Sequence, residues 1–107
     1  MVTGLSSFVP TDAQSTSTAT ATNLSRDLNT KDGGFLVAGA TNNVAAAQAC
    51  TWTGDQTPTE TYDTVAAGYG ESGAFTSAVV NDTANTVTAT FDVISTTGIA
   101  LAAAAWR

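Results

Sequence analysis

Residues 86–94 read Thr-Val-Thr-Ala-Thr-Phe-Asp-Val-Ile, and they carry the clearest structural signal in the chain. Apolar side chains alternate with threonine or aspartate along it. Successive side chains of a β-strand point to opposite faces of a sheet, so a period of two predicts a strand with one face buried. We therefore expect Val87, Ala89, Phe91 and Val93 to point into a core while the residues between them face water.

Turn signals flank this predicted strand on both sides. The segment Asn81–Asn85 is rich in Asn and Asp, whose side chains can bond their own backbone. Downstream, Ser95–Gly98 indicates a second turn before the largely apolar stretch Ile99–Trp106. We expect residues 86–94 and Ile99–Trp106 to form an antiparallel hairpin around Thr97 and Gly98, with the last strand central or covered on both faces.

The rest of the chain repeats this pattern of short strands between turns. Further strands are predicted at Ser15–Thr22, Phe35–Ala40, Cys50–Thr53, Glu60–Val65 and Ala74–Val80. A polar segment at Asn23–Asp32 and a Gly-rich stretch at Gly68–Gly73 are expected to be connections. Two assignments have alternatives: Ser15–Thr22 as a flexible linker, and the alanines of Ala45–Ala49 as a short helix instead of a loop or strand start.

Six to seven short strands at regular spacing predict an all-β fold, an antiparallel β-sandwich or jelly-roll-like domain. The length of 107 residues suits one domain with a modest core. We expect residues 1–14 to form an N-terminal arm and residues 15–107 to form the sandwich.

Charge is scarce, and this excludes several classes of function. Only 11% of the residues are charged, and three Lys and Arg residues against nine Asp and Glu residues give a net charge of −6. Nucleic-acid binding needs clustered Lys and Arg to replace counterions, and an anionic membrane surface attracts the same residues. We therefore expect neither nucleic acid nor membrane as a partner.

Catalytic and metal-binding groups are equally scarce. The chain has no His and a single cysteine, Cys50, so it cannot build a His-dependent triad or a site of several Cys and His ligands. A Ser–Lys pair would depend on Lys31 alone, in a predicted turn. Carboxylate pairs such as Glu60 with Glu71 or Asp63 are what any acidic domain offers. We expect no enzymatic activity, no cofactor and no metal.

Two groups of oxygen-bearing side chains are interpreted as solvated turn residues in preference to a weak divalent-cation site. They are Asp55, Glu60 and Asp63 in one region, and Asn81, Asp82 and Asn85 in another. Cys50 is expected to be a small buried hydrophobic residue on the same strand face as Trp52, with a reactive thiol or an intersubunit disulfide as alternatives.

Aromatic side chains supply the candidate contact residues. Trp52 and Trp106 are expected to anchor an alanine-rich core, although exposed aromatic rings could also stack on sugars. Tyr69, between two glycines, is the aromatic residue most expected to be exposed. The candidate surface contacts are Tyr69, Tyr62 and Phe8, with a protein or a glycan as the partner.

Four segments carry a resemblance to a known class of protein. They are Gly33-Gly34-Phe35-Leu36-Val37-Ala38, Thr51-Trp52-Thr53-Gly54, Glu60-Thr61-Tyr62-Asp63 and the alanine-rich Ile99–Trp106. In this succession, residues Thr30–Arg107 resemble Thr/Ala/Gly-rich β-sandwich modules of tailed-bacteriophage virion proteins. The resemblance implies a non-catalytic virion protein of the capsid decoration, cement or fibre type. Its partners would be other virion or assembly proteins and further copies of itself in a homo-oligomer.

Two other readings remain open. The chain could be a secreted or cell-surface β-sandwich that binds glycans or adheres. It could also be a subunit of an extracellular filament in which each chain donates a strand to the next, with the Thr-Ala-Thr-Ala-Thr segment at residues 18–22 as the donor.

Overall fold

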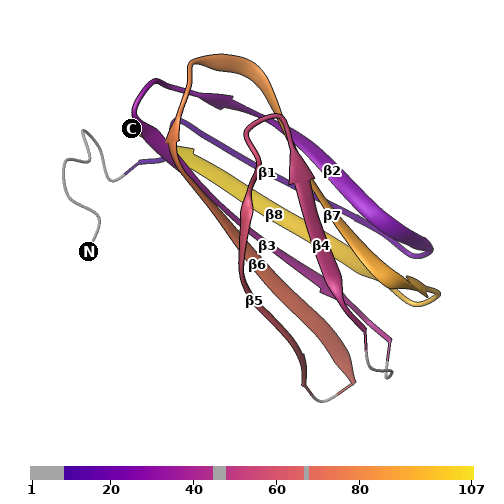
Figure 1. The fold of residues 1–107 in the computed structure, drawn as a ribbon. Helices are drawn as coiled ribbons and strands as arrows, with labels where there is room; N and C mark the ends of the chain where they lie inside the picture. Colours follow the sequence, from indigo (N-terminus) through magenta and orange to yellow (C-terminus); the bar gives the residue numbers. More distant parts are fainter. Residues whose placement is uncertain (1–8, 45–47, 67) are drawn as a thin grey trace.

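The computed structural model describes residues 9–44, 48–66 and 68–107, and their regular secondary structure is β-strand throughout (Figure 1). The predicted all-β fold is therefore confirmed, with eight strands in place of six to seven. They are β1 (Asp12–Thr18), β2 (Ala21–Thr30), β3 (Gly34–Asn42), β4 (Cys50–Gly54), β5 (Thr59–Ala66), β6 (Tyr69–Val79), β7 (Asp82–Ser95) and β8 (Ile99–Trp106).

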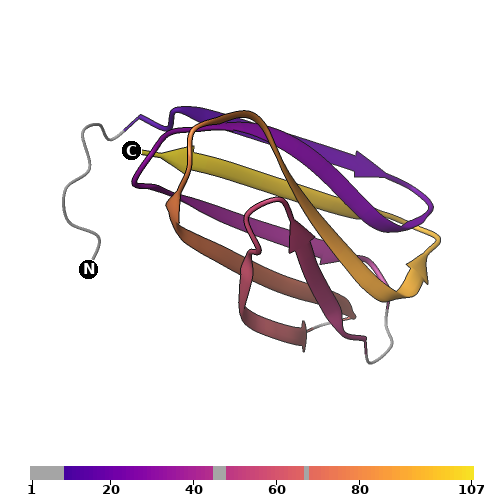
Figure 2. The ribbon, with the colours of Figure 1, turned by 45° about the horizontal axis from the view of Figure 1, so that its top comes forward.

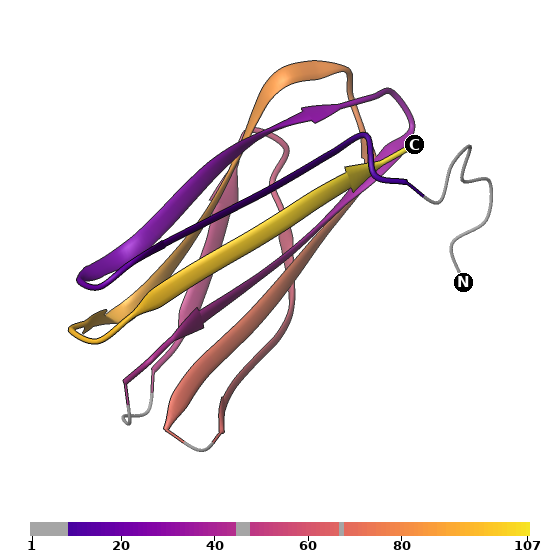
Figure 3. The same cartoon turned by 180° about the vertical axis from the view of Figure 1, so that it is seen from behind.

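The strands form two antiparallel sheets that pack face to face (Figure 2). One sheet has five strands in the order β1-β8-β3-β6-β5, and the other has three in the order β2-β7-β4. The smaller sheet covers one face of the larger. Seen from behind, the other face of the five-stranded sheet is crossed by no described segment (Figure 3).

The core lies between the sheets, and β7 supplies its centre. Val87, Ala89 and Phe91 are buried and Val93 is half-buried, which confirms the alternation predicted for residues 86–94. The five-stranded sheet contributes Leu36 and five alanines of β3, β6 and β8, among other residues. Because alanine is small, the two layers can approach closely around the few large side chains.

The hairpin predicted from residues 86–94 and Ile99–Trp106 is wrong. β7 lies in the three-stranded sheet, whereas β8 lies between β1 and β3 in the other. Both strands have an apolar face, and the chain buries both by crossing from one layer to the other at residues 96–98, where Gly98 has φ of +154°. The predicted central position of β8 is correct, but no described segment covers its outer face.

Two further segment assignments, both in the N-terminal third of the chain, are wrong. Residues 15–22 do not form one strand, because the chain turns at Ala19 and Thr20, between β1 and β2. The expected polar connection Asn23–Asp32 is largely strand β2. Its apolar residues are only Leu24 and Leu28, yet Leu28 is completely buried.

The stretch Gly68–Gly73 is a turn only at its start, because β6 begins at Tyr69. Gly70 and Gly73 lie inside this strand beneath the side chains of Gln48 and Tyr62, where a Cβ atom would collide with them. The glycines thus mark close packing instead of a change of chain direction.

The N-terminal part of the sandwich begins earlier than expected. β1 starts at Asp12, so the last three residues of the expected arm at 1–14 belong to a strand. Phe8, one of the candidate contact residues, lies outside the described residues, as do most of the alanines for which a short helix was the alternative.

Carboxylates tie the two sheets together along both sides of the sandwich. On one side, Oδ2 of Asp12 in β1 accepts a 2.9 Å hydrogen bond from the backbone N–H of Asn29 in β2. On the other, Oδ2 of Asp63 in β5 accepts a 3.0 Å bond from the backbone N–H of Cys50 in β4. Each bond satisfies a backbone donor at the margin of the three-stranded sheet, where no further strand is paired.

Candidate binding surface

The side of the five-stranded sheet that no described segment covers is the broadest candidate site, and the strand register shows which residues form it. We call it the outer face, meaning the outward-pointing residues of β1, β8, β3, β6 and β5. Side by side, in that strand order, one row consists of Ala13, Ala104, Val37, Phe75 and Thr59, and the next of Ser15, Ala102, Gly39, Gly73 and Tyr62.

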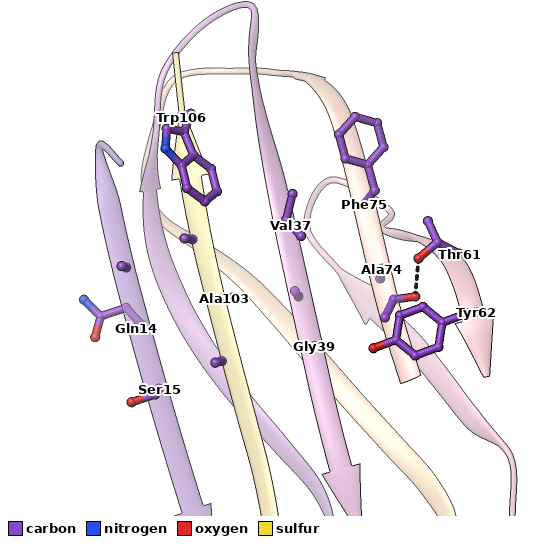
Figure 4. A pocket seen from close by; sticks show the side chains of 15 residues that line it. Gln14, Ser15, Val37, Gly39, Thr61, Tyr62, Ala74, Phe75, Ala103 and Trp106 are labelled. Atoms are coloured by element: carbon purple, nitrogen blue, oxygen red, sulfur yellow. Dashed lines mark hydrogen bonds between the residues drawn. The ribbon is translucent and has the colours of Figure 1, made fainter. Parts of the chain in front are cut away.

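The second of these rows forms a furrow across the strands. Its middle positions, Ala102, Gly39 and Gly73, carry at most a methyl group, and we call these three residues the furrow. They form part of the floor of an open groove of about 840 Å³. Figure 4 shows Gly39 in the middle of this groove, Gln14 and Ser15 at one edge and Tyr62 at the other.

An aromatic ridge borders the furrow. Trp106 stacks on Phe35 with ring centroids 5.2 Å apart and planes 11° apart, and Phe35 lies 6.0 Å from Phe75. Phe35, Phe75 and Trp106 are each half-buried, and we call them the ridge. Trp106 was expected in the core, but it is an outward position of β8, since Ile99, Leu101, Ala103 and Ala105 take the inward ones.

Trp52, in contrast, is a core residue as expected. It is 7% exposed, and its indole Nε1–H donates a 2.8 Å hydrogen bond to the hydroxyl of Ser72 across the sandwich. Cys50 is buried on the same face of β4, so the expectation that the two residues share a buried face is confirmed.

Tyr62 closes one end of the furrow. Its ring lies over Gly73, so closely that a Cβ atom at Gly73 would collide with it, and the side chain is 52% exposed. A register shift between Glu60 and Tyr62 occurs beside it. Within this irregularity, the hydroxyl of Thr61 donates a 3.0 Å hydrogen bond to the carbonyl oxygen of Gly73. The ring of Tyr62 thus covers Gly73 while the side chain stays open to solvent.

Tyr69 is exposed as predicted, at 45%, but it lies elsewhere. It lines a separate shallow depression with Thr41, Asn43, Thr97 and Gly98. The structure therefore does not bring Tyr62 and Tyr69 into one groove. The furrow escaped the sequence analysis because its signal, glycines at paired positions of β3 and β6, becomes visible only once the register is known.

Charge is almost absent from the outer face. Among the outward-pointing residues of the described strands in this sheet, Glu71 is the one ionisable acid or base other than Tyr62 and Tyr69. Other carboxylates serve structural roles: Asp55 accepts a hydrogen bond from the backbone N–H of Thr86, and Asp63 accepts one from that of Cys50. The surface is suited to dispersion and apolar contact.

Within the described part of the chain, no group of three His, Cys, Asp or Glu side chains lies where it could hold a metal ion. The described residues also contain no helix long and apolar enough to span a membrane.

Comparisons with protein-family models, with curated proteins and with solved structures found no match.

Proposed function

We propose that this chain is a non-catalytic structural module of a virus particle, of the capsid decoration, cement or fibre type, and that it acts through protein–protein contacts. The observation that carries the proposal is the outer face of the five-stranded sheet: it is broad, uncovered by the described chain, apolar and nearly free of charge. Large exposed apolar patches on small domains mark interaction surfaces.

The chemistry of the surface favours contact over turnover. The groove opens on the flat side of a sheet, and its lining is mostly alanine, glycine and aromatic side chains. General acid–base catalysis needs a titratable group held within hydrogen-bonding reach of a bound substrate. The carboxylates of Asp12, Asp63 and Asp55 are instead bonded to backbone N–H groups at the sides and ends of the sandwich.

The test is the location of the chain. Virus particles from the cells that carry its gene are purified on a density gradient, and the chain is detected with an antibody. We expect it to sediment with nucleic-acid-filled particles, and gold-labelled antibody to mark regular positions on them. An abundant cellular protein serves as the control for contamination. Recovery of the chain only in particle-free fractions or on the cell envelope would refute a role in the virion.

A glycan-binding or adhesive role is the second candidate, and Tyr62 favours it. An outward-turned aromatic ring beside a groove can stack on a sugar ring, and Ser15 and Gln14 offer hydrogen-bonding groups at the opposite edge. Titration with a panel of oligosaccharides, with Tyr62→Ala as the matched variant, tests this role. Binding that is lost in the variant would favour it.

The filament alternative gains no support from the sandwich. The segment considered as a donor, residues 18–22, spans the turn between β1 and β2, and both strands are paired within the chain.

A further inference from the structure

We propose that the outer face binds the outer face of a second copy of this chain, as a twofold dimer with the ridge of each copy set into the furrow of the other. The inference rests on the proposed function, because both assign this face to protein contact, and it names the partner. Three properties of the face support a second copy: its shape, its size and its distribution of charge.

The shape of the face is self-complementary. The ridge and the furrow lie side by side and involve the same strands, β8, β3 and β6. A twofold axis that runs parallel to the furrow, between it and the ridge, would place each ridge opposite the partner's furrow. Such an isologous contact uses one patch twice and therefore closes on itself. Ala102 and Gly39 leave room in the furrow for the aromatic rings of the ridge, whereas Gly73 is covered by the ring of Tyr62.

The size of the face is sufficient. Five strands spaced about 4.8 Å apart give a width of about 24 Å, and four rows of outward residues give a length of about 25 Å. Each copy would therefore contribute about 600 Å², or about 1,200 Å² for the pair, which reaches the lower end of the range for specific interfaces. We accordingly expect a dimer of moderate affinity.

The charge distribution keeps repulsive groups away from the contact. Each chain carries a net charge of −6, but the outer face has Glu71 as its one carboxylate among the described residues. Two copies therefore meet without burying many charges, while their overall charge opposes association at long range. We expect salt to strengthen the dimer, since it screens that repulsion.

The experiment is sedimentation of the whole chain over a range of concentrations, at about 0.01 M and about 0.1 M NaCl, where the screening length falls from about 30 to about 10 Å. We expect a reversible monomer–dimer equilibrium with a dissociation constant in the micromolar range and tighter association at the higher salt concentration. A wild-type chain that stays monomeric up to about 1 mM, far above a micromolar dissociation constant, would overturn the inference.

The decisive variant is Gly39→Arg. A Cβ atom at Gly39 meets no atom closer than 3.9 Å, so the fold accepts a side chain there, and that side chain enters the furrow. The matched control is Thr51→Arg, which adds the same charge at an exposed position of β4 in the other sheet. We expect Gly39→Arg to weaken the dimer at least about 100-fold, because it would bury an unpaired charge, and Thr51→Arg to leave it nearly unchanged.

Equal dimerisation of the two variants would overturn the inference. Ala102→Arg, at an exposed position in the same furrow, gives an independent second variant should Gly39→Arg prove unstable. The outcomes also separate the two proposals. A monomeric chain that is still found in virus particles would contradict only the dimer, and a dimer that is absent from particles would contradict only the virion role.

Discussion

Ser72 is the residue at which the two sheets share a buried hydrogen-bond chain. Its hydroxyl accepts from the indole of Trp52 in the smaller sheet and donates at 3.0 Å to the carbonyl oxygen of Tyr62 in the larger. Ser72 itself is completely buried. A single hydroxyl therefore satisfies one donor and one acceptor that the core would otherwise leave without a partner.

We predict that Ser72→Ala lowers the free energy of unfolding by about 1–3 kcal/mol, because the indole N–H of Trp52 would stay buried without an acceptor. Urea unfolding followed by tryptophan fluorescence measures the change. Ser77→Ala, at an exposed position of the same strand, is the control and should change stability by less than about 0.5 kcal/mol. Equal stability of the two variants would show that the hydrogen-bond chain contributes nothing.

We predict that the thiol of Cys50 reacts slowly in the folded chain. Burial, together with the negative charges of Asp63 and Glu60, raises the pKa of its thiol to about 11, although a hydrogen bond with Ser72 opposes the shift. The thiolate is the reactive form, so we expect a disulfide reagent at about pH 8 to label the folded chain at least about 100-fold more slowly than the urea-unfolded chain. Rapid labelling of the folded chain would instead support a reactive thiol.

The two tryptophans show which feature of single residues the sequence did not reveal. Trp52 lies between two threonines and Trp106 follows a run of alanines, and both were expected in the core. Only the parity of each position within its strand separates them: Trp106 follows the inward Ala105, whereas Trp52 is itself inward. In an alanine-rich strand both faces are apolar, so hydrophobicity does not reveal that parity.

Among the strands, the outermost ones show how the sandwich is closed. β1 and β5 are the edges of the larger sheet, and each extends a carboxylate to the backbone of the smaller sheet through Asp12 and Asp63. Arg26 in β2 adds a 3.0 Å bond from its Nε–H to the carbonyl oxygen of Ser15 in β1. These contacts occupy backbone groups that would otherwise be open to pairing with another chain.

We predict that the Asp12 contact makes stability depend on acid. The hydrogen bond from the backbone of Asn29, helped by Gln14, holds the pKa of Asp12 below its usual value. Folding therefore favours the ionised form, and this contribution is present above the pKa of an ordinary aspartate and is lost as the pH falls through the lower folded pKa.

Unfolding measured from about pH 5 down to about pH 2 should show a smaller loss of stability for Asp12→Asn than for the wild type. Asp27→Asn, at an exposed position of β2, leaves the Asp12 contribution in place and serves as the control. Identical acid profiles for Asp12→Asn and wild type would rule out the carboxylate as the source.

Strands with a clear apolar pattern were predictable, and the largely polar strand β2 was not. The period of two in residues 86–94 located β7 correctly, because one face is apolar and the other is threonine or aspartate. β2 was not predicted as a strand, because its inward positions include Arg26 and Thr30 beside its two leucines. The strands that pair with β8 were predicted wrongly, because a turn signal does not distinguish a hairpin from a crossing between layers.

For the whole molecule, composition and turn spacing sufficed for the fold class. Six to seven predicted short strands, rich in threonine and with small core residues, bury their apolar faces by packing in two layers. The outer face could not be predicted from the sequence, because the furrow consists of residues from β8, β3 and β6 that are far apart in sequence. Only the register places Ala102, Gly39 and Gly73 in one row.

The pairing of β1 with β8 has a mechanical consequence. The backbone N–H of Thr11 donates a 2.7 Å bond to the carbonyl oxygen of Ala105, and Asp12 pairs with the same residue, so the first strand starts where the last strand ends. Tension applied between these two points would pull along the direction of the interstrand bonds and break them one pair after another, not all at once. The domain would thus open at low force, and an assembly that bears load would need to carry it through the faces of the sheets.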